Sequence, residues 1–131
     1  MIVLVTGDRW WSDYVFILRS LESWHKYAGP IDLLVHGACR GADLMADRAA
    51  QSLGIPTVGH PAQWDRDGRA AGPIRNRKML IEHPDIELVI GYHDSISSSK
   101  GTRDMLKIAS NRGILCCLES HEEAICPWKN S

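Results

Sequence analysis

The chain has 131 residues, of which 44% are hydrophobic and 24% charged, and 15 Lys and Arg stand against 16 Asp and Glu for a formal net charge of -1. This length fits one domain of about 100–150 residues, and the apolar fraction excludes a disordered chain. The near-neutral charge argues against nucleic-acid binding, because domains that bind the phosphate backbone carry a marked basic excess. We therefore expect small ligands rather than DNA or RNA.

The sequence also lacks the patterns of membrane insertion and export. No run approaches the roughly 18–20 consecutive apolar residues of a bilayer span. The apolar start over residues 1–5 stops at Thr6-Gly7-Asp8-Arg9, without the basic start and small-residue cleavage site of an export signal. These features favour a soluble, cytoplasmic protein without a membrane partner.

The first half of the chain alternates strand and helix. Residues 2–6 are rich in β-branched side chains and end at Gly7, which predicts a buried strand. Ser12 or Asp13 fits the N-cap of a helix with an apolar residue at about every third position, and Gly29-Pro30 ends it. The next predicted elements are a strand over 31–36, an alanine-rich helix over 42–53 and a strand over 55–59.

The second half begins with a long loop over 60–72, which contains Pro, Asp, Gly and Arg without periodicity. Loops of this length inside a compact domain are usually functional. The remaining predicted elements are a helix from Pro73 to about His83, a strand over 87–92, a polar loop over 93–100, a helix over 102–111 and a strand over 114–118. We expect one domain over residues 1–118, with 119–131 as an irregular or weakly helical tail.

This alternation of strand and helix predicts an α/β fold. Parallel strands joined by right-handed helical crossovers bury such strands on both faces. We therefore expect a Rossmann-like, doubly wound, mainly parallel sheet of about five strands in a three-layer sandwich. Because ligands in this architecture lie at the carboxyl ends of the strands, the loops after the first four strands should form one rim that holds the site.

The loop after the first strand carries residues suited to a nucleotide. Gly7 lets the backbone approach a ligand closely, and Arg9 can pair with a phosphate through two parallel hydrogen bonds. The ring of Trp10 or Trp11 can stack on a base. A tight turn with a solvated arginine explains the same residues equally well.

The loop over 36–43 places two glycines around Arg40 at the start of a helix. Free N–H groups and the helix dipole favour an anion at such a position. The glycine spacing differs from that of the dinucleotide-binding fingerprint. Asp43 lies in the first helical turn, where it fits either a favourable charge against the dipole or a contact to a ribose hydroxyl.

Basic residues gather between Trp64 and Lys78, although the chain is nearly neutral overall. They are Arg66, Arg69, Arg75, Arg77 and Lys78. Helical geometry lets only some of them reach one pocket, so we expect at least half to be ordinary surface charge. The fourth loop, residues 97–102, offers hydroxyls, an ammonium group and helix-start amides that suit phosphate, although serine-rich loops are often only flexible.

The cysteines give no metal site. Cys39, Cys116, Cys117 and Cys126 are expected as free thiols in a reducing compartment. A zinc site that joins His121 to the last three is geometrically poor, because adjacent residues of a strand point to opposite faces. We therefore predict no metal and no cofactor.

Five segments in a fixed order carry a family resemblance. They are Val3 with Thr6-Gly7-Asp8-Arg9, the segment 36–43, Trp64, the segment 71–79, and Lys100-Gly101-Thr102-Arg103-Asp104-Met105. Together they resemble the SLOG superfamily, in particular its YspA-like branch, over roughly residues 1–118. Relatives include LOG-type phosphoribohydrolases, which release a base from a nucleoside 5′-monophosphate, the DNA-processing protein A, and modules that sense nucleotide-derived signals.

The resemblance implies a nucleotide or nucleotide-like ligand and self-association into a homo-oligomer. Phosphate is expected against Gly101 and Thr102, with Arg75 and Arg40 as clamps and Trp10 or Trp64 at the base. The ligand-contacting residues expected in all are Gly7, Asp8, Arg9, Gly37, Ala38, Arg40, Gly41, Asp43, Trp64, Arg75, Asn76, Ser98, Ser99, Lys100, Gly101 and Thr102.

Two departures from the LOG-type enzymes bear on catalysis. Their Pro-Gly-Gly-x-Gly-Thr-x-x-Glu motif has paired glycines where this chain has Ser98 and Ser99, and its glutamate aligns with Met105. Loss of that carboxylate removes the group expected to stabilise an oxocarbenium-like transition state. Arg75 matches the catalytic arginine in position, but arginine stays protonated at neutral pH and suits phosphate better.

We therefore expect a module that binds a nucleotide-related small molecule for sensing or sequestration. The first alternative is N-glycosidic cleavage of a nucleoside monophosphate, with Asp104 and Arg75 as catalytic residues, or Asp43 in place of Asp104. The second alternative is a nucleic-acid-binding module like the DNA-processing protein A, which the net charge disfavours.

Overall fold

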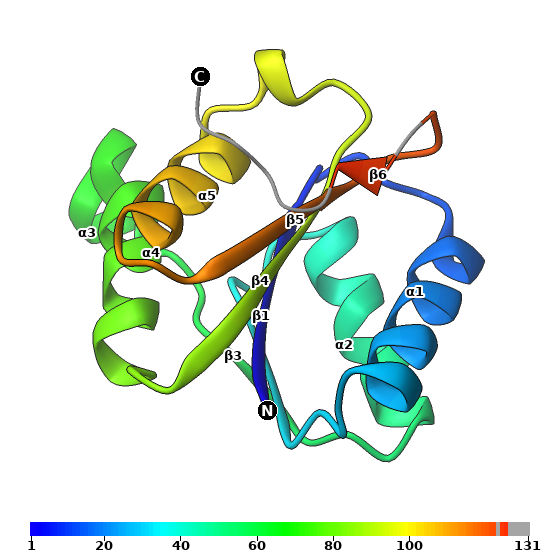
Figure 1. Cartoon of the computed structure of the whole chain (residues 1–131). Coiled ribbons are helices and arrows are strands. Elements are labelled where there is room, and N and C mark those ends of the chain that lie inside the picture. Colours follow the sequence, from blue (N-terminus) through cyan, green and yellow to red (C-terminus); the bar gives the residue numbers. More distant parts are fainter. Residues whose placement is uncertain (123, 126–131) are drawn as a thin grey trace.

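A central sheet organises the computed structural model, which describes residues 1–122 and 124–125 (Figure 1). Its strands follow the order β3-β2-β1-β4-β5-β6, the first five running parallel and β6 antiparallel to β5. Their bounds are β1 Ile2–Gly7, β2 Leu33–His36, β3 Thr57–Gly59, β4 Ile86–Tyr92, β5 Leu115–Glu119 and β6 Ala124–Ile125. The predicted doubly wound α/β fold is confirmed.

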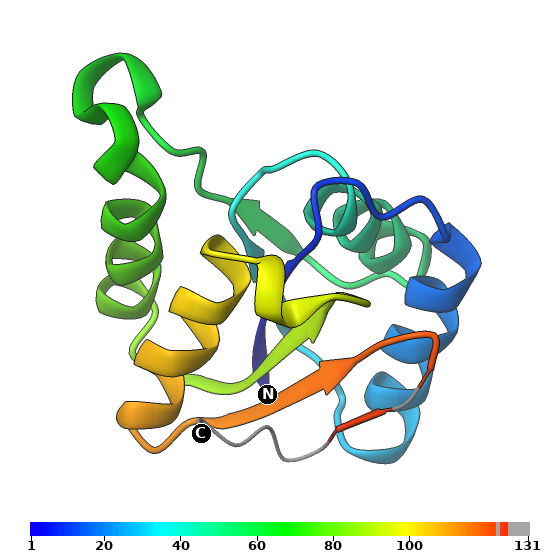
Figure 2. The same cartoon turned by 90° about the horizontal axis from the view of Figure 1, so that it is seen from above.

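Helices cover both faces of the sheet. α1 and α2 lie on one face and α4 and α5 on the other, while α3 stands beyond the end of α4 (Figures 1 and 2). The helix bounds are α1 Tyr14–Tyr27, α2 Ala42–Ser52, α3 Trp64–Asp67, α4 Ala71–Glu82 and α5 Gly101–Asn111, with short 3-10 turns at Gly68–Ala70 and Ile96–Ser98. No helix in the described part of the chain is long and apolar enough to cross a membrane.

The strands have two buried faces because the side chains of a strand alternate. Val3 and Val5 of β1 pack in the core with α1 and α2, whereas Leu4 between them packs in the core with α4 and α5. Cys116 and Cys117 of β5 divide in the same way between the two cores. The two thiols therefore face opposite sides of the sheet, as the sequence predicts, and Cys126 lies outside the described residues.

Two predicted segments differ from the structure. The loop expected over 60–72 contains α3 and a 3-10 turn, and α4 begins at Ala71 rather than at Pro73. A helix as short as α3 shows no apolar periodicity, so the pattern search could not find it. The predicted irregular or weakly helical tail from residue 119 is also wrong in part, because β5 includes Glu119 and β6 pairs with it.

Glu119 explains why β5 continues to that residue. Its carboxylate accepts hydrogen bonds from the hydroxyl of Ser20 at 2.7 Å and the indole of Trp24 at 3.2 Å, both on α1. A polar residue at the end of an apolar run is thus satisfied by a helix about 100 positions earlier in the chain. Local sequence contains no sign of this partnership.

Candidate functional site

The loops after β1, β2 and β4 meet at the carboxyl edge of the sheet (Figure 2). The N–H of Asp8 donates to the Tyr92 carbonyl at 2.9 Å, and the Asp8 carbonyl accepts from the N–H of Ala42 at 3.0 Å. Gly41 has φ +80°, and a Cβ there would lie 2.4 Å from the Asp8 carbonyl oxygen. Only glycine allows both this backbone conformation and this close approach.

Asp43 holds the loop after β2 from inside. Its side chain is buried, and Oδ2 accepts hydrogen bonds from the N–H groups of Gly37 at 3.0 Å and Cys39 at 3.3 Å. Burial raises the pKa of Asp43 to about 6, against the opposing effects of the Cys39 amide and the nearby His36 and Arg75. The structure thus gives this carboxylate a role in shaping the loop, beyond the two interpretations that the sequence offered.

The same loop contains a strained residue. Ala38 has φ +57°, a left-handed conformation that is uncommon for a residue with a side chain. Its N–H donates to Nδ1 of His36 at 3.0 Å, which helps to hold the turn. Strain of this kind is frequent at ligand-binding loops, where the surrounding structure maintains it.

Arg75 lies against this loop from α4. Its Nη1 donates to the carbonyl of Gly37 and, at 3.3 Å, to the carbonyl of His60. Its Nε donates to Oδ1 of Asn76 at 3.0 Å. A Cβ on Gly37 would lie 2.4 Å from Nη1 of Arg75, so the glycine makes room for the guanidinium. Arg75 therefore links α4 to the ends of β2 and β3.

Asn76 continues this connection to α5. It is buried, and its Nδ2 donates to the Gly101 carbonyl at 3.3 Å and to Oδ2 of Asp104 at 3.0 Å. Arg77 also lies 3.5 Å from Asp104. Arg75 and the first turn of α5, both predicted to face phosphate, are thus separated by one bridging side chain.

The loop before α5 is partly self-satisfied. The hydroxyl of Ser99 accepts from the N–H of Thr102 at 3.1 Å, and the hydroxyl of Ser98 donates to the Ser95 carbonyl at 2.8 Å. The side chain of Thr102 is buried, whereas Lys100 and Gly101 are exposed. Ser98, Lys100 and Gly101 are therefore the predicted site residues of this loop that are exposed, and Ser99 is half-buried.

Trp10 and Trp64, predicted to contact the base, and Arg40, predicted to clamp phosphate, lie on the surface of the protein. The guanidinium of Arg40 stacks over the ring of Trp10, with Cζ 4.1 Å from the ring centroid. Trp10 is 69% exposed, and Arg9 is exposed beside it. Trp64 is on α3 and is 54% exposed, away from this stack in the chain and bonded to none of the predicted site residues. Trp64 and Trp10 therefore do not contact each other in the structure.

A cavity of about 250 Å³ opens between the end of β3 and the helices α3 and α4. Its lining includes the cations Arg66, Arg75 and Lys78, together with His60 and Asp67. Arg66 pairs with Asp67 at 3.1 Å and Lys78 with Glu82 at 3.7 Å, whereas within the described part of the chain Arg75 donates only to uncharged groups, among them the carbonyls of Gly37 and His60. Such a basic hollow favours an anionic group.

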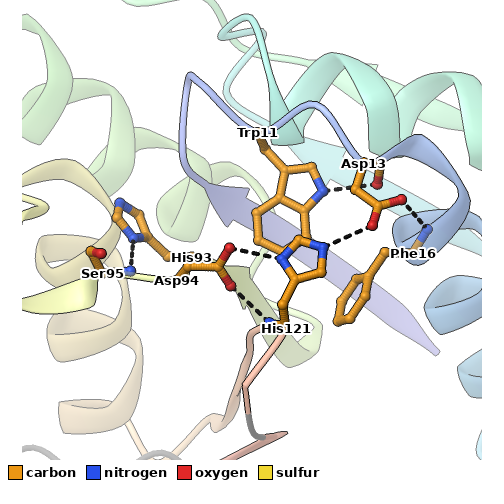
Figure 3. A network of polar contacts seen from close by, with 7 residues as sticks. All are labelled: Trp11, Asp13, Phe16, His93, Asp94, Ser95 and His121. Atoms are coloured by element: carbon orange, nitrogen blue, oxygen red, sulfur yellow. Dashed lines mark hydrogen bonds and ion pairs between the residues drawn. The ribbon is translucent and has the colours of Figure 1, made fainter.

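The imidazole of His121 lies between two carboxylates at the place where the loops after β1, β4 and β5 meet (Figure 3). Nδ1 of His121 lies 2.7 Å from Asp94 and Nε2 lies 2.8 Å from Asp13, and the ring stacks on Trp11 at 4.7 Å. These carboxylates raise the pKa of His121, through hydrogen bonds first and charge second. Asp13 also accepts from the Phe16 N–H, so the predicted N-cap is confirmed.

Comparison with known proteins places the chain in a family. The family model described as YspA, cpYpsA-related SLOG family matches residues 1–66, half of the chain. The chain belongs to this SLOG family. The Gene 61 protein of Mycobacterium phage D29 is similar to it, with 33% identity over 118 residues that cover 86% of this chain and 90% of that protein. No solved structure gives a significant match.

Membership in the SLOG family indicates binding or processing of a nucleotide-related ligand in general. The resemblance to the LOG-type enzymes aligns their glutamate with Met105, which is fully buried in the core that α4 and α5 form against the sheet. Asp104, one residue earlier, instead faces Asn76 and Arg77. In this SLOG protein the helical register thus turns the aligned position away from solvent.

Proposed function

We propose that this protein binds a nucleotide or nucleotide-derived small molecule, through its phosphate and ribose, for sensing or sequestration. The observation that carries the proposal is the position of Arg75. Its guanidinium joins the glycine-bearing loop after β2, the end of β3 and the basic cavity, and Asn76 connects it to the start of α5. A phosphate on Arg75 would gain charge-assisted hydrogen bonds from a group that the fold already holds in place.

The contacts of the carboxylates at the site favour ligand binding without a catalysed reaction. Asp43 is occupied by two backbone N–H groups, and Asp104 by Asn76 and Arg77. Met105 offers no ionisable group at the aligned position. A hydrolase would need a free carboxylate beside the sugar to stabilise an oxocarbenium-like transition state.

Isothermal titration calorimetry against nucleoside mono- and diphosphates, ADP-ribose and cyclic nucleotides tests the proposal. Loss of a charge-assisted hydrogen bond of about 1.5–3 kcal/mol corresponds to an affinity loss of roughly 10–100-fold, which we expect for Arg75→Ala. Arg112→Ala is the matched control, because Arg112 is exposed at the end of α5 away from the rim. Absence of binding across the panel, or unchanged affinity in Arg75→Ala, would overturn the proposal.

Two further measurements separate the alternatives. Thermal unfolding of Arg75→Ala and Arg75→Lys shows whether a lost affinity reflects lost folding, because Arg75 also bonds two loop carbonyls. Chromatography of a nucleoside monophosphate incubated with the protein reveals any released base. Base release that stops in Asp104→Asn would replace binding alone with phosphoribohydrolase activity.

A further inference from the structure

A second cluster of polar side chains lies at the opposite end of α4 from the rim. His60 follows β3, and Glu82 and His83 form the last residue and the C-cap of α4. Nε2 of His60 and Nε2 of His83 lie 2.8 Å apart, and Nδ1 of His60 lies 3.4 Å from the Glu82 carboxylate. One donor atom from each of the three residues can be chosen so that all lie within 4.8 Å of one another.

The backbone holds both histidines where they are. The N–H of His60 donates to the His36 carbonyl at 2.9 Å, and the His60 carbonyl accepts from Arg75. The N–H of His83 donates to the Met79 carbonyl at 3.0 Å, while its ψ of 70° takes the chain out of the helix. The two rings meet edge to face with centroids 5.0 Å apart. The pair is therefore built by the fold rather than by one flexible segment.

The chemistry of these three donors fits a transition metal. Two imidazole nitrogens and one carboxylate are a known Zn²⁺ ligand set that leaves a fourth position open. Nitrogens at about 2.0–2.1 Å from a tetrahedral ion lie roughly 3.3 Å apart, so the two rings need to separate by only about 0.5 Å.

We propose that His60, Glu82 and His83 form a binding site for a divalent metal ion of the Zn²⁺ class. None of the three residues is among those predicted to contact the nucleotide-related ligand, although His60 also lines the basic cavity beside Arg75. One neighbour opposes the metal: Nζ of Lys78 lies 3.7 Å from the Glu82 carboxylate and competes for it. This ammonium makes a specific prediction about affinity possible.

The test is titration of the full chain, stripped with a chelator, with ZnCl₂ at neutral pH, followed by calorimetry and by thermal unfolding. We expect one saturable site per chain that raises the unfolding temperature, because the ion binds the folded state. His83→Gln should weaken this site by at least about 100-fold, since loss of even an outer-sphere partner costs 10–100-fold. Lys78→Met should tighten it by about 3–10-fold, because one positive charge is removed near the ion.

A second ligand variant and a control variant complete the test. Glu82→Gln is the second ligand variant, because its side chain is 44% exposed and its loss does not threaten folding. His121→Gln removes an exposed histidine between two carboxylates on the other side of the molecule and should leave Zn²⁺ affinity unchanged. Absence of saturable binding, or equal affinity in His83→Gln and the unaltered protein, overturns the proposal. If His121→Gln loses Zn²⁺ affinity, the metal binds at His121 and its two carboxylates instead, and the proposal is also overturned.

Discussion

Asp43→Asn tests whether burial of one carboxylate controls the pH dependence of stability. The amide oxygen can take the place of Oδ2 and keep both hydrogen bonds from Gly37 and Cys39, while the charge is removed. The folded pKa of Asp43, about 6, exceeds its ordinary value of 3.8. Its contribution to stability is therefore fully present below the ordinary value and is lost as the pH rises through about 6.

The size of the effect follows from these two values. Relative to Asp43→Asn, the unfolding free energy of the unaltered protein should fall by about 1 kcal/mol between about pH 5 and about pH 8. The limiting difference, reached only in stronger acid, is about 3 kcal/mol. Other carboxylates such as Asp13 and Asp94 have lowered pKa values and act in the opposite direction, so the comparison with the variant isolates Asp43.

Urea unfolding of both proteins across this pH range measures the difference directly. Asp65→Asn is the control, because Asp65 is exposed on α3 and its charge is not taken out of water. The reasoning is refuted if the two unfolding free energies keep a constant difference from pH 5 to pH 8. It is also refuted if the unaltered protein gains on the variant as the pH rises, because the nearby Arg75 would then outweigh burial.

Three other substitutions give distinct results. Gly37→Ala places a Cβ 2.4 Å from the Arg75 guanidinium, so urea unfolding should show a loss of about 1–3 kcal/mol and calorimetry a loss of nucleotide affinity. Met105→Glu puts a carboxyl group into a fully buried position and should cost about 3 kcal/mol or more without creating base release in the chromatographic assay. His121→Gln should lower the unfolding temperature more at pH 5.5 than at pH 9, because a raised histidine pKa stabilises the protonated, folded form.

The sequence predicted the elements that have strong local patterns. Residues 2–6 are continuously β-branched or apolar, and the buried parallel strand β1 needs this on both faces. Asp13 was recognisable as a cap because capping is a contact between residues three apart. By contrast, α3 spans only one turn with no buried residue, so no apolar repeat marks it.

The rim was predictable as a region, but the contacts within it were not. Strand alternation places the loops after β1, β2 and β4 at one edge, and the predicted residues Gly37, Asp43 and Arg75 do lie in direct contact there. The sequence did not indicate what Asp43 contacts. The two roles predicted for it, a charge near the helix dipole and a contact to a ribose hydroxyl, both assumed that its carboxylate is exposed to solvent. Its hydrogen-bond partners Gly37 and Cys39 lie in the loop after β2, and Arg75, which bonds to the same loop, is 38 residues from Gly37 along the chain.

His60 shows most clearly why the remaining features escape a reading of local patterns. The helix α4 rises about 1.5 Å per residue, so Arg75 and His83 lie roughly 12 Å apart along its axis. His60 nevertheless contacts both, the first through its carbonyl and the second through its imidazole, because it extends along the helix. No spacing rule relates residue 60 to residues 75 and 83 at once. A metal ion that pulls His60 and His83 together would therefore act on the same residue whose carbonyl positions Arg75, which couples the two proposed sites through one side chain and one peptide group.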